Sequence, residues 1–217
     1  MIRSIAMRLQ RQLLLITLLW ITAMVGCRPA DEVPVAVDTS KQERLGRGST
    51  HDDVSDIEGN QHRLFDHTSN RFQVITFVTT DCPIANVYQP ILRKLAEDFS
   101  EAKIDFFQVN PTRSATIEEA KLHSSDFEIT SPMILDSDQA IADRLGAKVT
   151  PETFLISPSG EVVYRGRIDN LYVGFGKKRQ KPTSHDLRGA INSALALQPI
   201  STPATTPVGC IIQYDHK

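Results

Sequence analysis

The sequence lacks three features that would each assign it to a class of protein. Its formal net charge is only −2 over 217 residues, and without a dominant basic face nucleic-acid binding is not expected. It has no apolar run of the roughly 20 residues that a membrane-spanning helix needs. Its six histidines show no His-x-x-x-His spacing, so we expect no resident metal and no other cofactor. A hydrophobic content of 41% still suffices for one globular core of ordinary size.

The first 26 residues have the pattern of an export signal. Three arginines precede the apolar stretch 13–25, which Gly26 and Cys27 follow. This stretch is too short to span a bilayer and fits a secretory signal. Residues 24–27 resemble a bacterial lipoprotein box, in which Cys27 would be lipidated and become the first residue of the mature protein. Ordinary signal cleavage is the alternative.

These patterns divide the chain into four expected parts. We predict a signal peptide at 1–26, a flexible tether at 27–48, a folded domain at 49–198 and a Pro/Thr-rich tail at 199–217. The protein is then a lipoprotein anchored to a membrane on the periplasmic side. With Cys27 under lipid, only two cysteines remain, and outside the cytoplasm two thiols can persist as a disulfide.

Strand and helix patterns alternate through the folded domain. A hairpin is expected at 55–65, and the later strands are expected at 74–78, 103–109, 133–135, 149–156 and 161–165. Helices are expected after Cys82 and at 116–123, 139–145 and 184–197. This order predicts an α/β fold with a central mixed sheet, helices on both faces and an N-terminal β-hairpin extension.

Two local details of the last third of the chain are also predicted. Thr183 and Asp186 have the spacing of a capping box at the start of the last helix. The basic run 177–181 lies between glycines and a proline, which is typical of a solvated loop.

Cys82 is placed where a thiol becomes reactive. The apolar run 74–78 ends at Thr79, and Cys82-Pro83 then begins a segment with helical spacing. Pro83 suits the first position of a helix, because its missing N–H has no partner to lose there. A thiol at a helix N-terminus faces the positive end of the helix dipole, which stabilises the thiolate. We therefore expect Cys82 to be a nucleophile; the alternative is an inert buried thiol.

Three stretches together resemble the thioredoxin fold, in its peroxiredoxin-like and TlpA-like branch of redoxin domains. They are residues 57–66, 77–83 and 149–166. The third contains Pro151 inside a strand, where proline loses a ladder hydrogen bond. The resemblance implies a cis Thr150-Pro151 bond facing Cys82. It also implies that Thr150, Pro151 and Pro83 form the substrate groove, in which the Thr150 backbone would bind a polypeptide.

The chain departs from both branches of this family at informative places. Ala85 stands where thioredoxins have the second cysteine of Cys-x-x-Cys. Ile75 stands where peroxiredoxins have proline in Pro-x-x-x-Thr-x-x-Cys, although Thr79 matches the threonine and is implied to orient the thiolate. Three residues are candidates for the peroxidase arginine: Arg144, Arg165 and Arg167.

Cys210 is the natural second thiol. The roughly 13 residues between the last helix and Cys210 reach about 40 Å when extended, whereas a domain of about 150 residues has a radius of gyration near 15 Å. Cys210 can therefore return to Cys82 and resolve a mixed disulfide or sulfenic acid formed there. We expect an extracytoplasmic thiol oxidoreductase that acts on a protein disulfide or a peroxide. An external thiol reductant would then reduce its Cys82–Cys210 disulfide.

Two other interpretations stay open. Cys82 and Cys210 could form a permanent structural disulfide in a non-catalytic binding module. With one histidine they could instead bind Cu(I), as in the Sco-type copper chaperones that share this fold. Asn86 occupies the second place of the Cys-x-x-x-Cys that those chaperones use.

Overall fold

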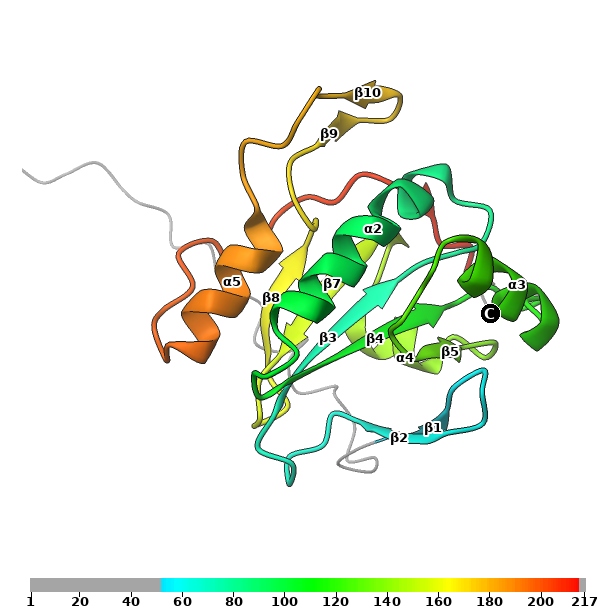
Figure 1. Ribbon diagram of the computed structural model, residues 1–217, viewed down its shortest axis with the longest axis horizontal. Helices are drawn as coiled ribbons and strands as arrows, with labels where there is room; N and C mark the ends of the chain where they lie inside the picture. The colour runs from blue at the N-terminus through cyan, green and yellow to red at the C-terminus, as the bar shows by residue number, and fades with distance from the viewer. Residues whose placement is uncertain (1–51, 215–217) are drawn as a thin grey trace, which may run out of the picture. The chain divides into compact units, whose positions relative to one another are not determined.

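A five-stranded sheet is the centre of the fold in the computed structural model, which describes residues 52–214 (Figure 1). The strand order is β5-β4-β3-β7-β8. The bounds are β3 (Phe72–Phe77), β4 (Ile104–Asn110), β5 (Met133–Leu135), β7 (Glu152–Ile156) and β8 (Val162–Gly166). Strands β3, β4 and β5 run parallel, whereas β7 is antiparallel to both β3 and β8. The predicted mixed sheet is confirmed.

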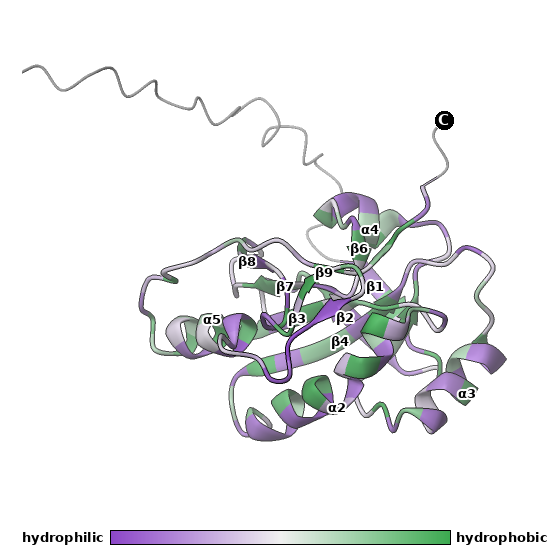
Figure 2. Ribbon diagram, turned by 90° about the horizontal axis from the view of Figure 1, so that it is seen from above, coloured by the Kyte–Doolittle hydropathy of each residue, from purple (hydrophilic) through white to green (hydrophobic). Residues whose placement is uncertain are grey.

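Helices cover both faces of this sheet. Helices α2 (Pro83–Asp98) and α5 (Asp186–Leu195) contribute to one buried apolar cluster, and α4 (Ala140–Leu145) contributes to a second. Figure 2 shows α2 and α4 on opposite sides of the sheet. Helix α3 (Ile117–Asp126) begins with a complete capping box between Thr116 and Glu119. The predicted helices on both faces are therefore confirmed.

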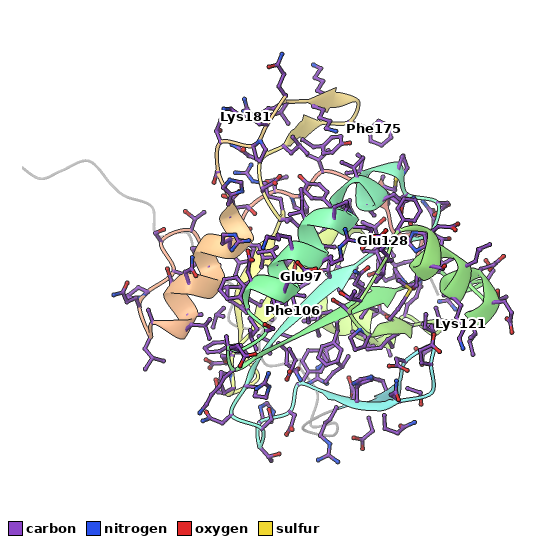
Figure 3. The ribbon with its side chains drawn as sticks, in the orientation of Figure 1. Glu97, Phe106, Lys121, Glu128, Phe175 and Lys181 are labelled. Atoms are coloured by element: carbon purple, nitrogen blue, oxygen red, sulfur yellow. The ribbon has the colours of Figure 1, made fainter. Side chains whose placement is uncertain are left out.

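Two short hairpins lie outside the central sheet. The predicted N-terminal hairpin is formed by β1 (Asp52–Ser55) and β2 (Gln61–Leu64). The second hairpin joins β9 (Tyr172–Gly174) to β10 (Lys177–Lys178), so the prediction of a loop throughout 177–181 was wrong for its first two residues. Local turn composition indicated a loop, but backbone pairing across Phe175 and Gly176 makes a ladder. Figure 3 shows Phe175 and Lys181 projecting from this part of the chain, away from the sheet.

The start of α5 also differs from the prediction. His185 is the N-cap residue, and its side chain makes no capping hydrogen bond. The Thr183 backbone N–H instead donates to Asn170 Oδ1 (2.8 Å), and the Asp186 carboxylate accepts from Arg167 Nε (2.8 Å). The predicted Thr183–Asp186 capping box is therefore wrong, because tertiary contacts engage both residues.

The tail returns across the end of the domain. Its strand β11 (Cys210–Ile211) is antiparallel to β6 (Val149–Thr150), which directly precedes Pro151. Before it, the Arg165 backbone exchanges hydrogen bonds with tail residues 203–205. After it, Ile212 is only 6% exposed and belongs to the cluster that contains α4. Figure 1 shows this segment in red. The tail is thus part of the packed domain.

The predicted signal peptide, tether and lipidated Cys27 lie outside the described residues. Within residues 52–214, no helix combines the length and the apolar composition that crossing a membrane requires.

Candidate redox site

Cys82 is the N-cap residue of α2, as its position before Pro83 predicts. Its backbone is extended, with φ −83° and ψ 108°, and Pro83 occupies the first helical turn. The Cys82 sulfur accepts the backbone N–H of Ala85 at 3.4 Å. The Cys82 backbone N–H donates to the Thr79 carbonyl at 3.3 Å, which closes the turn between β3 and α2. The thiol therefore lies at the helix N-terminus, where an anion is stabilised.

Thr150, the last residue of β6, contacts the same Cys82 sulfur. The Thr150-Pro151 bond is cis, as expected, and the Cys82 thiol lies 2.9 Å from the Thr150 carbonyl oxygen, to which it donates. The Thr150 hydroxyl also interacts with the Cys82 sulfur. The Thr79 hydroxyl lies 3.3 Å from the Thr150 hydroxyl. Thr79 thus contacts Thr150 through its hydroxyl and holds the Cys82 backbone through its carbonyl.

Cys210 completes the site from the tail. In the β11–β6 ladder it lies directly opposite Thr150. Its thiol and its backbone N–H lie near the Cys82 sulfur and favour its thiolate form, and the two cysteines are free thiols. A residue 128 positions later in the chain thus meets Cys82 at its sulfur, in the reduced state.

The two thiols differ in acidity. Burial opposes ionisation of Cys82, but the donors from Cys210, Ala85 and Thr150 together outweigh burial and lower its pKa. Burial and the neighbouring Cys82 sulfur raise the pKa of Cys210 to about 12, and the Asp81 carboxylate adds to this rise. When the pair loses one proton, the negative charge therefore resides on Cys82 while Cys210 keeps its S–H.

The expected substrate groove is filled by the protein's own tail. Cys82 is 0% exposed and Thr150 is buried, because β11 occupies the Thr150 backbone edge. A Cβ atom on Gly209 would lie 2.0 Å from the Thr150 carbonyl oxygen, so the two backbones touch. Pro151 is also buried, and only Pro83 is exposed. In this state Thr150 is not free to bind a polypeptide, contrary to the sequence-based expectation.

The three candidate peroxidase arginines are engaged elsewhere. Arg144 pairs with Asp52 at 3.0 Å, Arg165 pairs with Glu152 at 3.2 Å, and Arg167 pairs with Asp186.

An arginine that the sequence analysis did not consider lies near the site. A cavity of about 340 Å³ lies beside Cys210 and is lined in part by Thr79, Asp81 and Arg113. Arg113 follows the carboxyl end of β4, the parallel neighbour of the strand that leads to Cys82. That adjacency is a signal that could have identified Arg113, because the ends of parallel strands gather functional groups.

Asn86, one helical turn after Cys82, connects the site to His123. The Asn86 amide donates to the Thr80 carbonyl at 3.1 Å, and its oxygen lies 2.8 Å from His123 Nε2. Burial lowers the pKa of His123. Within residues 52–214, no three His, Cys, Asp or Glu side chains form a group that could hold a metal ion. Among these residues, the Cu(I) interpretation has only the two thiols as ligands.

Comparison with known proteins supports the fold and the family. The AhpC/TSA family matches residues 49–165, which is more than half of the chain. The thiol-disulfide oxidoreductase ResA of Geobacillus thermodenitrificans is 28% identical over 121 residues. That match covers 53% of this chain and 66% of the relative, which is just under two thirds of its length.

Two solved structures extend the likeness of fold over most of the domain. A hypothetical protein of Sinorhizobium meliloti aligns with a TM-score of 0.67 and 22% identity, covering 77% of this chain and 92% of its own. An uncharacterized conserved protein of Geobacillus kaustophilus aligns with a TM-score of 0.68 and 23% identity, covering 80% of this chain and 93% of its own. With the sheet order, the cis-proline and the family match together, the chain belongs to the AhpC/TSA family and has a thioredoxin-like redoxin fold.

Proposed function

We propose that this protein is a thiol-disulfide oxidoreductase in which Cys82 and Cys210 alternate between dithiol and disulfide. One observation carries the proposal: Cys210 lies opposite Thr150 in the β11–β6 ladder, and the Thr150 carbonyl accepts the thiol of Cys82 at a helix N-terminus. This arrangement stabilises one thiolate and holds a second thiol in contact with it. The name of the relative from Geobacillus thermodenitrificans, a thiol-disulfide oxidoreductase, supports the same chemistry.

Catalysis then takes two exchange steps. The Cys82 thiolate attacks one sulfur of a substrate disulfide, forms a mixed disulfide and releases the other substrate sulfur as a thiolate. Cys210 loses its proton and attacks Cys82, which expels the second substrate thiolate and forms the Cys82–Cys210 disulfide. The substrate gains two electrons and the protein loses two. An external thiol reductant restores the dithiol.

Access to Cys82 requires movement of the tail. The sulfur is fully buried, and β11 occupies the edge through which a polypeptide would approach. The β11–β6 ladder has only two register pairs, so its opening breaks few backbone hydrogen bonds. Lifting the tail exposes Cys82 and Thr150 together, and the Thr150 edge then becomes available to a substrate strand.

We also propose that the protein works outside the cytoplasm and is anchored through lipid on Cys27. The support is the sequence pattern of residues 1–27 and the redox use of two thiols, which persists more readily outside the cytoplasm. Mass spectrometry of the mature N-terminus tests this part. A diacylated Cys27 is expected in the wild type, and a soluble product is expected from Cys27→Ala.

Thiol titration tests the central proposal. We expect two free thiols in the purified reduced protein, and their joint loss on incubation with oxidised glutathione. Cys82→Ser should abolish the exchange, while Cys210→Ser should accumulate a mixed disulfide at Cys82. Consumption of hydrogen peroxide in place of disulfides would assign the peroxidase alternative.

The non-enzymatic alternatives give different results in the same samples. A structural disulfide predicts no free thiol at the start and unfolding on reduction. A copper carrier predicts one tightly bound Cu(I) per chain and no turnover of either oxidant.

A further inference from the structure

The two sulfurs of the site differ in how they meet solvent. Cys82 is 0% exposed, whereas Cys210 is half-buried and contributes to the wall of the 340 Å³ cavity. Cys82 is not part of that wall. The residue after Cys210, Ile211, is 72% exposed, so β11 itself faces outward on this side. A thiol that approaches the closed site therefore reaches Cys210 first.

Oxidation changes which sulfur can be reached. In the dithiol state the tail can lift, because only hydrogen bonds and packing hold it. A Cys82–Cys210 disulfide would tie β11 covalently to the start of α2. The contacts on either side of the bond, Gly209 against the Thr150 carbonyl and Ile212 in the core, then keep the tail closed over Cys82. The oxidised protein thus exposes one sulfur of the pair.

The stability of the departing thiolate also favours attack on Cys210. A thiolate that attacks Cys210 expels Cys82, whose sulfur accepts the backbone N–H of Ala85 at the start of α2, where a thiolate is stabilised. Attack on Cys82 would expel Cys210, which lies on the strand β11 and is not at the start of a helix. Thiol-disulfide exchange is faster when the departing thiol is the stronger acid. Access and leaving-group stability therefore favour the same sulfur.

We propose that Cys210 is the sulfur at which an external dithiol reductant reopens the oxidised protein, entering through the cavity lined by Thr79, Asp81 and Arg113. This inference rests on the proposed Cys82–Cys210 redox pair. One reductant thiolate attacks Cys210, forms a mixed disulfide with it and releases Cys82 as a thiolate. The second reductant thiolate then attacks the reductant's own sulfur in that bond and releases Cys210, which takes up a proton. The reductant becomes a disulfide, and two electrons pass to the protein.

The substrate and the reductant consequently meet different sulfurs. The substrate disulfide reacts with Cys82 in the dithiol state, when the tail can lift. The reductant reacts with Cys210 in the disulfide state, when the tail is locked. The tail thereby separates two half-reactions that a single exposed cysteine would mix.

Adduct mapping tests the inference. The oxidised full-length domain with its tail is mixed with excess reduced glutathione as the probe thiol, quenched with acid after short times, alkylated and digested. Mass spectrometry then shows which cysteine carries glutathione and which carries the alkyl group. We expect early adducts on Cys210 to exceed those on Cys82 by roughly tenfold or more. The same reaction in denaturing guanidinium should lose this preference, because access and local donors are then equal.

The possible outcomes distinguish a failure of this inference from a failure of the proposed function. Early adducts mainly on Cys82, or divided equally in the folded protein, would overturn the role of Cys210 and leave the redox pair intact. Failure of the Cys82–Cys210 disulfide to form on oxidation would overturn the proposed function, and the inference with it.

Discussion

The tail pair β11–β6 and the hairpin β9–β10 are both short antiparallel ladders outside the central sheet, but their surroundings differ. The tail pair is held by Ile212, buried in the core, and by Tyr214, whose hydroxyl donates to the Ala147 carbonyl at 2.7 Å. In the hairpin, Val173 is 52% exposed and Phe175 is 75% exposed. Isolated two-stranded pairs are marginally stable in water. The comparison shows that burial of the side chains next to the β11–β6 ladder, rather than the ladder itself, keeps the tail over Cys82.

The largest effect is expected from Ile212→Ala, which removes the buried anchor of the tail. Truncation of a buried isoleucine to alanine costs about 2–5 kcal/mol. Because Ile212 lies on the tail, much of this loss should favour the lifted tail. We expect the alkylation rate of Cys82 in the reduced protein to rise by roughly tenfold or more. An alkylation rate equal to that of the wild type would show that other contacts hold the tail.

Gly209→Ala should also loosen the tail over Cys82, because Gly209 directly precedes Cys210. Its added methyl group collides with the Thr150 carbonyl, and overpacking of this kind costs about 1–3 kcal/mol. Alkylation of Cys82 should again accelerate. Gly189→Ala is the matched control, because a Cβ at that helical glycine meets nothing within 4 Å. An equal increase of the Cys82 alkylation rate in both variants would contradict the proposal that the tail covers Cys82.

Cys210→Ala should change the acidity of Cys82 more than its exposure. The variant removes the thiol donor that helps to lower the pKa of Cys82, so this pKa should rise. The midpoint of the alkylation rate against pH should therefore move to higher pH. Cys210→Ser, which keeps an O–H donor, should give a smaller shift. A midpoint that is unchanged in both variants would remove the basis for a paired site.

The smallest effect is expected from Phe175→Ala in the β9–β10 hairpin. Because this ring is mostly solvent-exposed, the free energy of unfolding should change by no more than about 0.5 kcal/mol. Cys82 alkylation should match the wild type. Denaturant titration checks the first expectation, and a large loss of stability would show that the hairpin contributes to the packed domain as the tail does.

Local sequence patterns were sufficient for the central sheet and for Cys82. The β-branched run of β3, the Cys82-Pro83 step and the break at Pro151 each fix the backbone within a few residues. The resemblance to redoxin domains then implied the cis bond beside Cys82, which the structure contains.

Features set by distant contacts could not be predicted in the same way. Thr183 has an ideal capping spacing, but a hydrogen bond with Asn170 uses its backbone. For Cys210, the number of residues after the last helix predicted only how far the tail can reach. Its register opposite Thr150 depends on Gly209 and Ile212 meeting groups more than 50 residues away. Local sequence patterns therefore could not predict that the tail occupies the Thr150 edge.

The pairing of β11 with β6 has a practical consequence for anyone who expresses this protein. A fragment that stops after α5 keeps all five central strands and the whole family match, yet it leaves the Val149–Thr150 edge bare. Bare strand edges associate with other chains, so such a fragment should self-associate in light scattering. Biochemical work on this chain should therefore retain everything through Tyr214.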